Sequence, residues 1–324
     1  METRIFITRP LPARITELLS AKGYSVDTNP KDILLTQKQL IRFLKKKPYD
    51  AVLTLLTDKI DSAVFDATPS VKLYANYSTG YDNIDIVEAK KRGIVVTNAP
   101  TEETATAVAE HTIALLLALS TRLVDAHAFV RKGKFKGWNP SSFVGTRIAG
   151  KILGLVGCGA IGQKVAALAH ALGMEVIYTD VKRNDSIETE YGAKYYESLD
   201  ALLTVADVVS IHAPLLPSTH HLFDATRLSH MKPTAYIINT SRGPVIDERA
   251  LEDALYEKQI AGAGLDVFEF EPTIRKRLRR LPTAVLTPHI ASATIEARNA
   301  MTDIVIQNIV EFFEGRTPPH TVTS

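Results

Sequence analysis

The chain has 324 residues, of which 45% are hydrophobic and 23% are charged. This length exceeds that of an average domain, so we expect a large core divided between two domains. The 38 basic and 36 acidic side chains give a net charge of only +2, which argues against a protein that binds nucleic acid or an anionic membrane surface.

The single cysteine and the apolar stretches indicate the cellular compartment of the protein. Cys158 has no partner for an intrachain disulfide, which is compatible with a reducing compartment. The first ten residues lack an apolar run of signal-peptide length, and the most apolar helix that we expect, over residues 104–123, contains Glu110 and His111. We therefore expect a cytoplasmic protein that is neither secreted nor embedded in a membrane.

The first hundred residues alternate between short apolar runs and helical patterns. Strands are expected over residues 4–8, 51–56, 72–77 and 93–97, with helices over residues 12–22, 36–46 and 85–92. This alternation predicts one α/β domain with a parallel sheet that is covered on both faces. No glycine fingerprint follows its first strand, so we expect this domain not to bind a nucleotide.

A long helix is expected to start near Pro100, after Asn98-Ala99. Apolar residues cover most of its circumference, which predicts burial between domains or subunits and favours a homodimer. Residues 131–147 are rich in Gly, Pro, Ser and basic side chains and predict an extended loop. Trp138 in this loop is a candidate to pack against a neighbouring subunit or to line an active-site mouth, and simple anchoring of the loop explains it equally well.

The most informative motif is KILGLVGCGAIG, residues 151–162, a short apolar strand that ends in three spaced glycines. Gly157 permits a tight turn, Gly159 lets the backbone approach a pyrophosphate, and Gly162 lets the next helix pack against the strand. A strand that leads into such a turn and then a helix predicts a dinucleotide site.

The helix that follows is expected over residues 163–172. Its N-terminal N–H groups would face the pyrophosphate. Ala160 and Ile161, in the glycine loop before this helix, are further candidates for cofactor binding. The next strand, over residues 176–179, ends in Asp180. A carboxylate there accepts hydrogen bonds from both ribose hydroxyls of NAD and would repel the 2′-phosphate of NADP, so we expect NAD as the cofactor.

Two basic residues, Lys182 and Arg183, follow Asp180 closely. They would soften the preference for NAD if they reached the cofactor. We favour their interpretation as a solvated basic pair.

The alternation resumes after Asp180. Further strands are expected over residues 205–211, 235–239, 261–267 and 284–287, with helices over residues 198–204, 248–257 and 295–314. With the two central strands they supply a complete doubly wound sheet. The expected domains are a NAD-binding Rossmann domain over residues 100–292 and a substrate domain over residues 1–99 and 293–324, with a hinge near Ala99 and Ser292.

Polar residues follow three of these strands. Arg242 comes after Asn239-Thr240-Ser241, Asp266 ends the strand AGAGL, Glu271 lies five residues later, and His289 follows VLTP. Ligands of open α/β sheets bind beyond the carboxyl ends of the strands, so these side chains are expected to converge on one crevice.

The residue types suit hydride transfer to a 2-oxo acid. The carbonyl oxygen gains negative charge during reduction, so it needs a proton donor and a positive neighbour. His289 is the candidate acid, with Glu271 to hold its ring and stabilise the imidazolium. Arg242 is the candidate to bind the substrate carboxylate and polarise the carbonyl. Five other histidines lack such a setting and are interpreted as structural or cofactor-adjacent: His111, His212, His220, His221 and His230.

Three segments, INTSRGPVIDERAL, AGAGLDVFEFEP and VLTPHIASAT, closely resemble the signatures of the D-isomer-specific 2-hydroxyacid dehydrogenases. The resemblance extends over about residues 52–319. It implies that Arg242, Glu271 and His289 are the catalytic residues and that Asp266 holds the nicotinamide carboxamide. It implies a Rossmann-type doubly wound domain and a smaller flavodoxin-like α/β substrate domain built from both termini.

The resemblance also implies positions near the cofactor at Pro214, Thr219 and Thr240. Within the family, the segments LLTDKID and ANYSTGYDNID are most similar to the glyoxylate and hydroxypyruvate reductases. In that branch the backbone N–H groups of residues 78–80 would cradle the substrate carboxylate opposite Arg242. The implied substrate-binding residues are Leu55, Ser78, Thr79, Gly80, Arg242 and Ser292.

We therefore expect NAD-dependent reduction of a small 2-oxo acid, glyoxylate or hydroxypyruvate before pyruvate or phenylpyruvate, with no metal ion. Phosphite is an alternative substrate, because AFVRKGKFKGWNP resembles phosphite dehydrogenases, but those enzymes carry a lysine in place of Thr79. Phosphoglycerate and formate rank lower. A NAD-sensing corepressor is the alternative from another class, and the intact Arg242, Glu271 and His289 set argues against it.

Overall fold

A computed structural model describes residues 2–322, and the chain divides into two compact units. The first unit comprises the residues up to Thr104 together with the segment from Thr294 onward, and the second comprises Ala105–Ala293. Each unit has one parallel β-sheet with helices on both faces, so the predicted α/β fold class is confirmed.

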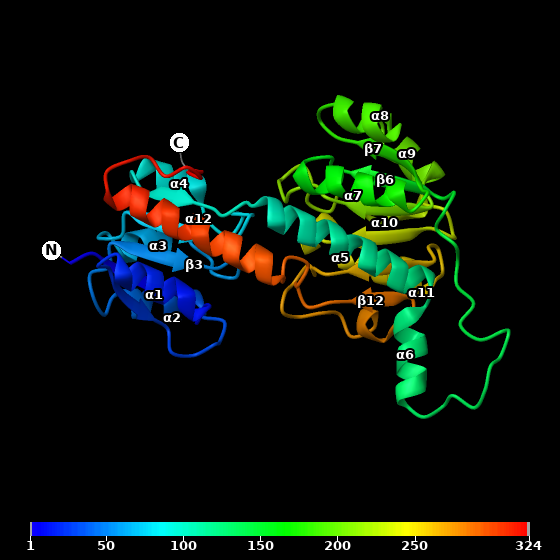
Figure 1. Ribbon diagram of the computed structural model, residues 1–324, viewed down its shortest axis with the longest axis horizontal. Coiled ribbons are helices and arrows are strands. Elements are labelled where there is room, and N and C mark those ends of the chain that lie inside the picture. Colours follow the sequence, from blue (N-terminus) through cyan, green and yellow to red (C-terminus); the bar gives the residue numbers. More distant parts are fainter. Residues whose placement is uncertain (1, 323–324) are drawn as a thin grey trace. The chain divides into compact units, whose positions relative to one another are not determined.

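The first unit has five parallel strands in the order β2-β1-β3-β4-β5, which is the flavodoxin-like order. The strands are β1 (Arg4–Ile7), β2 (Ser25–Thr28), β3 (Ala51–Thr54), β4 (Leu73–Asn76) and β5 (Val95–Thr97). The helices are α1 (Ala13–Ala21), α2 (Gln37–Leu44), α3 (Ser62–Ala67), α4 (Ile86–Lys91) and α12 (Ile295–Phe313). Figure 1 shows α12 beside this sheet, where Val305 and Ile309 pack with Ile5, Leu53 and Leu73.

The second unit has seven parallel strands in the order β12-β11-β10-β9-β6-β7-β8. The strands are β6 (Ile152–Val156), β7 (Glu175–Thr179), β8 (Lys194–Tyr195), β9 (Val208–Ile211), β10 (Tyr236–Asn239), β11 (Gly262–Leu265) and β12 (Ala284–Leu286). The strand order reverses between β6 and β9, the crevice where doubly wound sheets bind dinucleotides.

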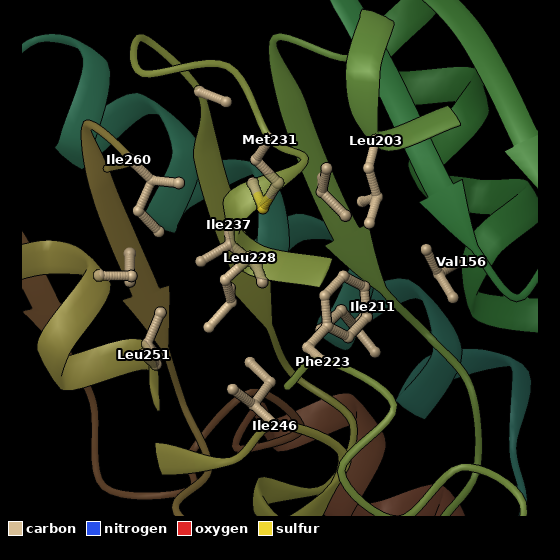
Figure 2. Close-up of a cluster of buried hydrophobic side chains, with 14 of the residues drawn as sticks. Val156, Leu203, Ile211, Phe223, Leu228, Met231, Ile237, Ile246, Leu251 and Ile260 are labelled. Atoms are coloured by element: carbon tan, nitrogen blue, oxygen red, sulfur yellow. The ribbon is translucent and has the colours of Figure 1, made fainter. Parts of the chain in front are cut away.

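Helices cover both faces of this second sheet. They are α5 (Glu102–Ser120), α7 (Ala160–Ala171), α8 (Asp185–Tyr191), α9 (Leu199–Val205), α10 (Ala225–Ser229) and α11 (Glu248–Tyr256), with short 3-10 turns η1 (Gly243–Val245) and η2 (Leu278–Arg280). A further helix, α6 (Leu123–Arg131), has no buried residue and does not cover the sheet. Leu153 and Leu155 of β6 join a core with α5 and α7. On the other face Val156 belongs with Ile211 and Phe223 to a second core, which Figure 2 shows in close-up.

Helix α5 lies directly on β11, and the sequence of that strand explains how. A Cβ on Gly264 would lie 3.0 Å from the Cβ of Leu115 and 2.9 Å from Cδ1 of Ile238, so glycine is needed for this close approach. Leu115 and Leu119 are buried as a result. The apolar circumference of α5 is thus largely explained by packing within the chain, and it is not by itself evidence of a subunit interface.

Several short elements were not predicted from the sequence, among them the edge strands β2 and β8 and the helices α3, α6, α8 and α10. β2 reads SVDT and is only half-buried, so it carries little apolar signal. Residues 132–151 contain no helix or strand, as the composition of this loop predicts.

Helix α6 and the loop after it expose apolar side chains. No single helix among the described residues has the length and hydropathy of a membrane span. Helices α5 and α6 reach that length and hydropathy only when they are taken together, and the pair is bent by 67°. The exposed apolar residues of α6 and the loop are Leu123, Val124, Val130, Phe135, Trp138 and Val144. We call α6 with residues 132–150 the arm.

Candidate active site

The glycine loop between β6 and α7 contains three glycines whose surroundings differ. Gly157 has φ +92°, and a Cβ there would lie 2.8 Å from the carbonyl carbon of His212. A Cβ on Gly162 would overlap the carbonyl oxygen of Gly157. Packing within the protein therefore requires both of these glycines, as the sequence predicts for a tight turn and a close helix–strand contact.

Gly159 differs, because a Cβ there would meet no atom within 4 Å. It is exposed, as is Ala160, the first residue of α7, while Ile161 is half-buried. Nothing within the described chain explains a glycine at this place. A ligand backbone or phosphate that approaches the first turn of α7 would explain it, so the loop fits the pyrophosphate of a dinucleotide.

Asp180, at the end of β7, lies next to this loop. Its Oδ2 accepts a hydrogen bond from the Cys158 N–H at 2.5 Å, and Oδ1 has no partner in the part of the chain that the structure describes. Cys158 itself is buried, and burial followed by the nearby Asp180 carboxylate raises the pKa of its thiol to about 12. The thiol is therefore protonated, which agrees with its interpretation as a small filler residue.

The two basic residues after Asp180 differ in their surroundings. Arg183 forms two contacts with Glu188, at 2.7 and 3.1 Å, and its guanidinium lies 5.4 Å from the ring centre of Tyr195. Lys182 is exposed. Both side chains are therefore exposed to solvent, and α8 supplies a counter-ion to Arg183.

The loop after β9 brings Pro214 and Thr219 together. The Thr219 hydroxyl donates to the Pro214 carbonyl at 2.6 Å, and the Leu216 N–H donates to the same hydroxyl at 2.8 Å. The backbone of His212 and Ala213, just before this loop, packs against Gly157. The loop therefore borders the glycine turn.

The segment after β10 presents Arg242. Asn239 holds the turn by accepting from the N–H and hydroxyl of Ser241 and donating to the Arg242 carbonyl. Thr240 is buried and its hydroxyl lies 2.9 Å from that of Thr112 on α5. A Cβ on Gly243 would overlap the backbone of Phe268, so the Arg242 turn rests on the segment that leads to Glu271.

Asp266, at the end of β11, is fully buried. It accepts hydrogen bonds from the Thr287 hydroxyl at 2.7 Å and from the N–H groups of Ile290 and Ala291 at 2.9 and 2.7 Å. Burial alone would raise the pKa of this carboxyl, but hydrogen bonds from His111, Thr287 and the two N–H groups outweigh it and hold the pKa below its usual value. Asp266 is therefore an ionised anchor at the strand ends.

His289 and Glu271 meet after β12. Nδ1 of His289 lies 2.9 Å from Oε2 of Glu271, while Oε1 of Glu271 accepts the Phe268 N–H at 3.0 Å. Both side chains are about one-quarter exposed, at 26% and 27%, so the pair is held in place and still reachable by a substrate. With Nδ1 engaged, Nε2 of the imidazole is the atom that can give or take a proton.

The segment after His289 continues the site. Its backbone N–H groups at Ile290 and Ala291 bind Asp266, and the half-buried Ser292 follows them. Arg242, Asp266 and His289 thus stand at the carboxyl ends of the adjacent strands β10, β11 and β12.

One residue that sequence reasoning did not assign to the site is His111 of α5. Its Nε2 lies 3.0 Å from the Thr287 hydroxyl and 3.5 Å from Oδ1 of Asp266. Its signal was a polar side chain in an apolar helix, since a buried polar group needs a partner. His212 contacts Ser210, His220 stacks on His221, and His230 lies near Asp200.

Two loops of the first unit carry the remaining predicted residues. The Leu55 N–H donates to the buried Asp58 at 2.8 Å, and the Asn83 side chain donates to the Leu55 carbonyl at 3.0 Å. Asn76 donates to the Gly80 carbonyl at 2.8 Å and to Asn83 at 3.1 Å. The two loops are therefore joined through Asn76 and Asn83.

Residues 78–80 differ in one respect from what the resemblance implies. The Ser78 N–H donates to the Asn76 carbonyl at 2.8 Å, because the chain turns tightly there, so this group is already used. Within the described chain the N–H groups of Thr79 and Gly80 have no acceptor. These two, and not Ser78, have the donors available for a carboxylate. Among the described residues no group of three His, Cys, Asp or Glu side chains could hold a metal ion.

Comparisons with known proteins agree with this architecture. Residues 113–291 match the family of the D-isomer specific 2-hydroxyacid dehydrogenase, NAD binding domain. The chain is 44% identical to a glyoxylate reductase from Thermococcus litoralis, over 99% of this chain and 97% of that protein.

Two solved structures are also similar over 99% of the chain. The TT0316 protein from Thermus thermophilus has a TM-score of 0.91 at 38% identity and is covered completely. An NADPH-dependent glyoxylate/hydroxypyruvate reductase from Sinorhizobium meliloti, in complex with NADP and malonate, has a TM-score of 0.86 at 32% identity, with 97% of it covered. The chain therefore belongs to the D-isomer specific 2-hydroxyacid dehydrogenases, oxidoreductases with a nicotinamide cofactor, and to their glyoxylate/hydroxypyruvate reductase branch.

Proposed function

We propose that this enzyme reduces glyoxylate or hydroxypyruvate to the D-2-hydroxy acid with NADH. The observation that carries the proposal is the His289–Glu271 pair at 2.9 Å, on the strand ends of a sheet that also bears the glycine loop. The names of the relatives support the substrate class. The second unit acts as the nucleotide-binding domain and the first as the substrate domain.

His289 is the general acid of the reduction. Glu271 accepts from Nδ1, which fixes the tautomer, orients the ring and leaves Nε2 to deliver a proton to the carbonyl oxygen. In the reverse direction Nε2 takes the proton back from the hydroxy acid, and the Glu271 carboxylate stabilises the imidazolium that forms.

Arg242 binds the substrate carboxylate and polarises the carbonyl with its fixed fork of donors. The N–H groups of Thr79 and Gly80 add further donors for the carboxylate, and Leu55 limits the size of the pocket. The half-buried Ser292 is a further substrate contact in this proposal. The nicotinamide, when bound, supplies the hydride.

The cofactor would be held by Gly159, Ala160 and Ile161 at the pyrophosphate, by Asp180 at the ribose and by Asp266 at the carboxamide. Pro214, Thr219 and Thr240 would border it. We propose NAD because Oδ1 of Asp180, which has no partner among the described residues, suits ribose hydroxyls and would repel a 2′-phosphate. The contact of Arg183 with Glu188 supports this choice, since it gives that guanidinium another anion to bind.

A homodimer is the assembly that we propose. The arm exposes Val130, Phe135 and Trp138, at 57%, 61% and 85%, in a chain whose other apolar side chains are mostly buried. Exposed apolar side chains gathered in one segment are typical of a subunit contact. Figure 1 shows α6 and the loop extending from the second unit.

Substitution of the catalytic residues tests the chemistry. His289→Asn and Arg242→Ala should each lower kcat/KM for glyoxylate on the order of 10²- to 10⁴-fold. The first removes the proton donor, and the second removes the guanidinium that binds the substrate carboxylate. Binding of NADH, measured by fluorescence titration, should not change. His230→Asn, an exposed histidine near Asp200, is the matched control and should retain full activity. Undiminished turnover in both site variants would contradict the proposal.

A further inference from the structure

The carboxylate of Glu271 comes from a segment that has no helix or strand of its own. Between the end of β11 at Leu265 and the start of η2 at Leu278, the only regular feature is an isolated bridge between Phe270 and Thr273. A catalytic carboxylate must be held within about 0.5 Å of its working position. Something outside the segment must therefore fix it.

Glu248, the first residue of α11, is placed to do this. Its side chain is buried, at 3% exposure. One oxygen, Oε2, accepts the Glu269 N–H at 3.0 Å, and the other, Oε1, accepts the Arg275 N–H at 3.0 Å. These two amides lie on either side of Glu271, so a single carboxylate joins both ends of the loop that carries it.

The loop in turn holds Glu248. Oε2 of Glu269 accepts the Glu248 N–H at 3.0 Å, and Oε1 of Glu269 lies 2.8 Å from Nε2 of His221. Each glutamate therefore binds the backbone of the other. This reciprocal pair anchors the loop to the start of a helix that packs in the core through Leu251 and Leu255.

The contacts continue from the loop to the reacting group. Phe268, whose backbone rests on Gly243, donates its N–H to Glu271, and Glu271 binds His289. A displacement of residues 269–275 would therefore move the carboxylate that orients the imidazole.

We propose that Glu248 is a positioning residue for hydride transfer, which acts by clamping the loop around Glu271. The inference rests on the proposed function only in that Glu271 and His289 perform the chemistry. Charge-assisted hydrogen bonds to both amides require two acceptor oxygens. A glutamine offers one acceptor and would set an N–H donor against the second amide.

Glu252 supplies a matched control one helical turn later. It is equally buried at 3% and its Oε2 accepts the Leu278 N–H at 2.9 Å, an amide seven residues from Glu271. Its Oε1 lies 3.3 Å from Nε of Arg275 and 3.1 Å from Nε of Arg277, so Glu252 contacts the Arg275 side chain, whereas Glu248 binds the Arg275 backbone. Glu248→Gln and Glu252→Gln each remove one buried charge from the same helix. They differ in the loop contacts that are lost: Glu248 accepts two backbone N–H groups on either side of Glu271, and Glu252 contacts the loop only through the Arg275 side chain.

The test compares kcat, KM, the pH profile of 2-oxo acid reduction and the thermal midpoint of these variants with Glu271→Gln. Glu248→Gln should lower kcat on the order of 10- to 100-fold with KM within about twofold, since a misplaced catalytic group costs turnover. The alkaline limb of its pH profile should move toward lower pH, as in Glu271→Gln. Glu252→Gln should lower the thermal midpoint but leave kcat and the limb unchanged.

Amide hydrogen exchange gives a readout that needs no turnover. Glu248→Gln should speed exchange in residues 268–276, and Glu252→Gln should not. If Glu248→Gln fails to fold, Glu248→Asp, which keeps the charge but is too short to span both amides, carries the same expectations.

Equal effects of the two glutamine variants on kcat and on exchange, or unchanged exchange in residues 268–276 of Glu248→Gln, would overturn the clamp. If the unmodified enzyme reduces no 2-oxo acid, the proposed function fails, while the exchange data still decide whether Glu248 holds the loop.

Discussion

His289 has φ +56°, a left-handed backbone conformation that costs a residue with a side chain on the order of 1–3 kcal/mol. Its N–H donates to the Asp266 carbonyl at 2.8 Å, which helps to hold this conformation. Residues kept in such conformations gather at functional sites. The turn directs the ring to Glu271, so backbone strain and the proposed role of the histidine have one structural origin.

The buried His212 makes the stability of the folded chain depend on pH. It follows β9, and burial lowers the pKa of its imidazole to about 4. The unfolded chain takes up this proton near pH 6.5, whereas the folded chain stays neutral. Protons therefore favour unfolding, and the stability that this neutral ring contributes is lost as the pH falls from about 6.5 toward about 4.

We predict that His212→Gln removes this part of the pH dependence. The free energy of unfolding of the unmodified enzyme, relative to that of the variant, should fall on the order of 2 kcal/mol between about pH 7 and about pH 4.5. Urea unfolding at both pH values measures it, and the common titration of carboxylates cancels in the difference. A difference that is the same at the two pH values would show that His212 does not titrate in this way.

At the scale of elements, the central strands were predictable because both of their faces are buried. β3, β4 and β9 are buried at every residue and read as short apolar runs in the sequence. The edge strands β2 and β8 lack such runs, since an edge strand is only partly covered. The short helices α3 and α10 contain six and five residues, too few for a periodic pattern to emerge.

Some residues of the site were likewise predictable from the sequence, and others were not. Arg242, Asp266 and His289 could be placed together from sequence because parallel strands end on one edge of the sheet. His111 and Glu248 could not, because their partners come from segments distant in sequence. Their importance depends on contacts such as the 3.0 Å bond between Glu248 and the Arg275 N–H, which no local pattern reveals.

The arm is the element whose exposed apolar side chains call for a partner. If it forms the subunit contact, a charge at Val130 and at Trp138 should weaken assembly, because burying an unpaired carboxylate is costly. Sedimentation equilibrium should give the mass of two chains for the unmodified enzyme and of one chain for Val130→Asp/Trp138→Asp. Val87→Asp, at a valine of α4 that is 66% exposed, is the control and should remain dimeric.

A monomeric unmodified enzyme would contradict the proposed homodimer. A double variant that remains dimeric would place the contact outside the arm.

For the whole molecule, each unit has a complete sheet and its own cores, so the two proposed tasks are assigned to separately built parts. The second unit carries the glycine loop, Asp180 and the His289–Glu271 pair. The first unit carries the paired loops around Leu55 and Gly80. In our proposal Leu55 limits the size of the substrate.

The central claim is that this enzyme reduces a small 2-oxo acid with NADH. The measurement that tests it most directly is the initial rate of NADH oxidation with glyoxylate, hydroxypyruvate, pyruvate and phenylpyruvate, each repeated with NADPH. We predict the highest kcat/KM for glyoxylate or hydroxypyruvate, with NADH preferred over NADPH. A preference for phenylpyruvate would contradict the small pocket, a preference for NADPH would contradict the role of Asp180, and no oxidation with any of the four would contradict the claim itself.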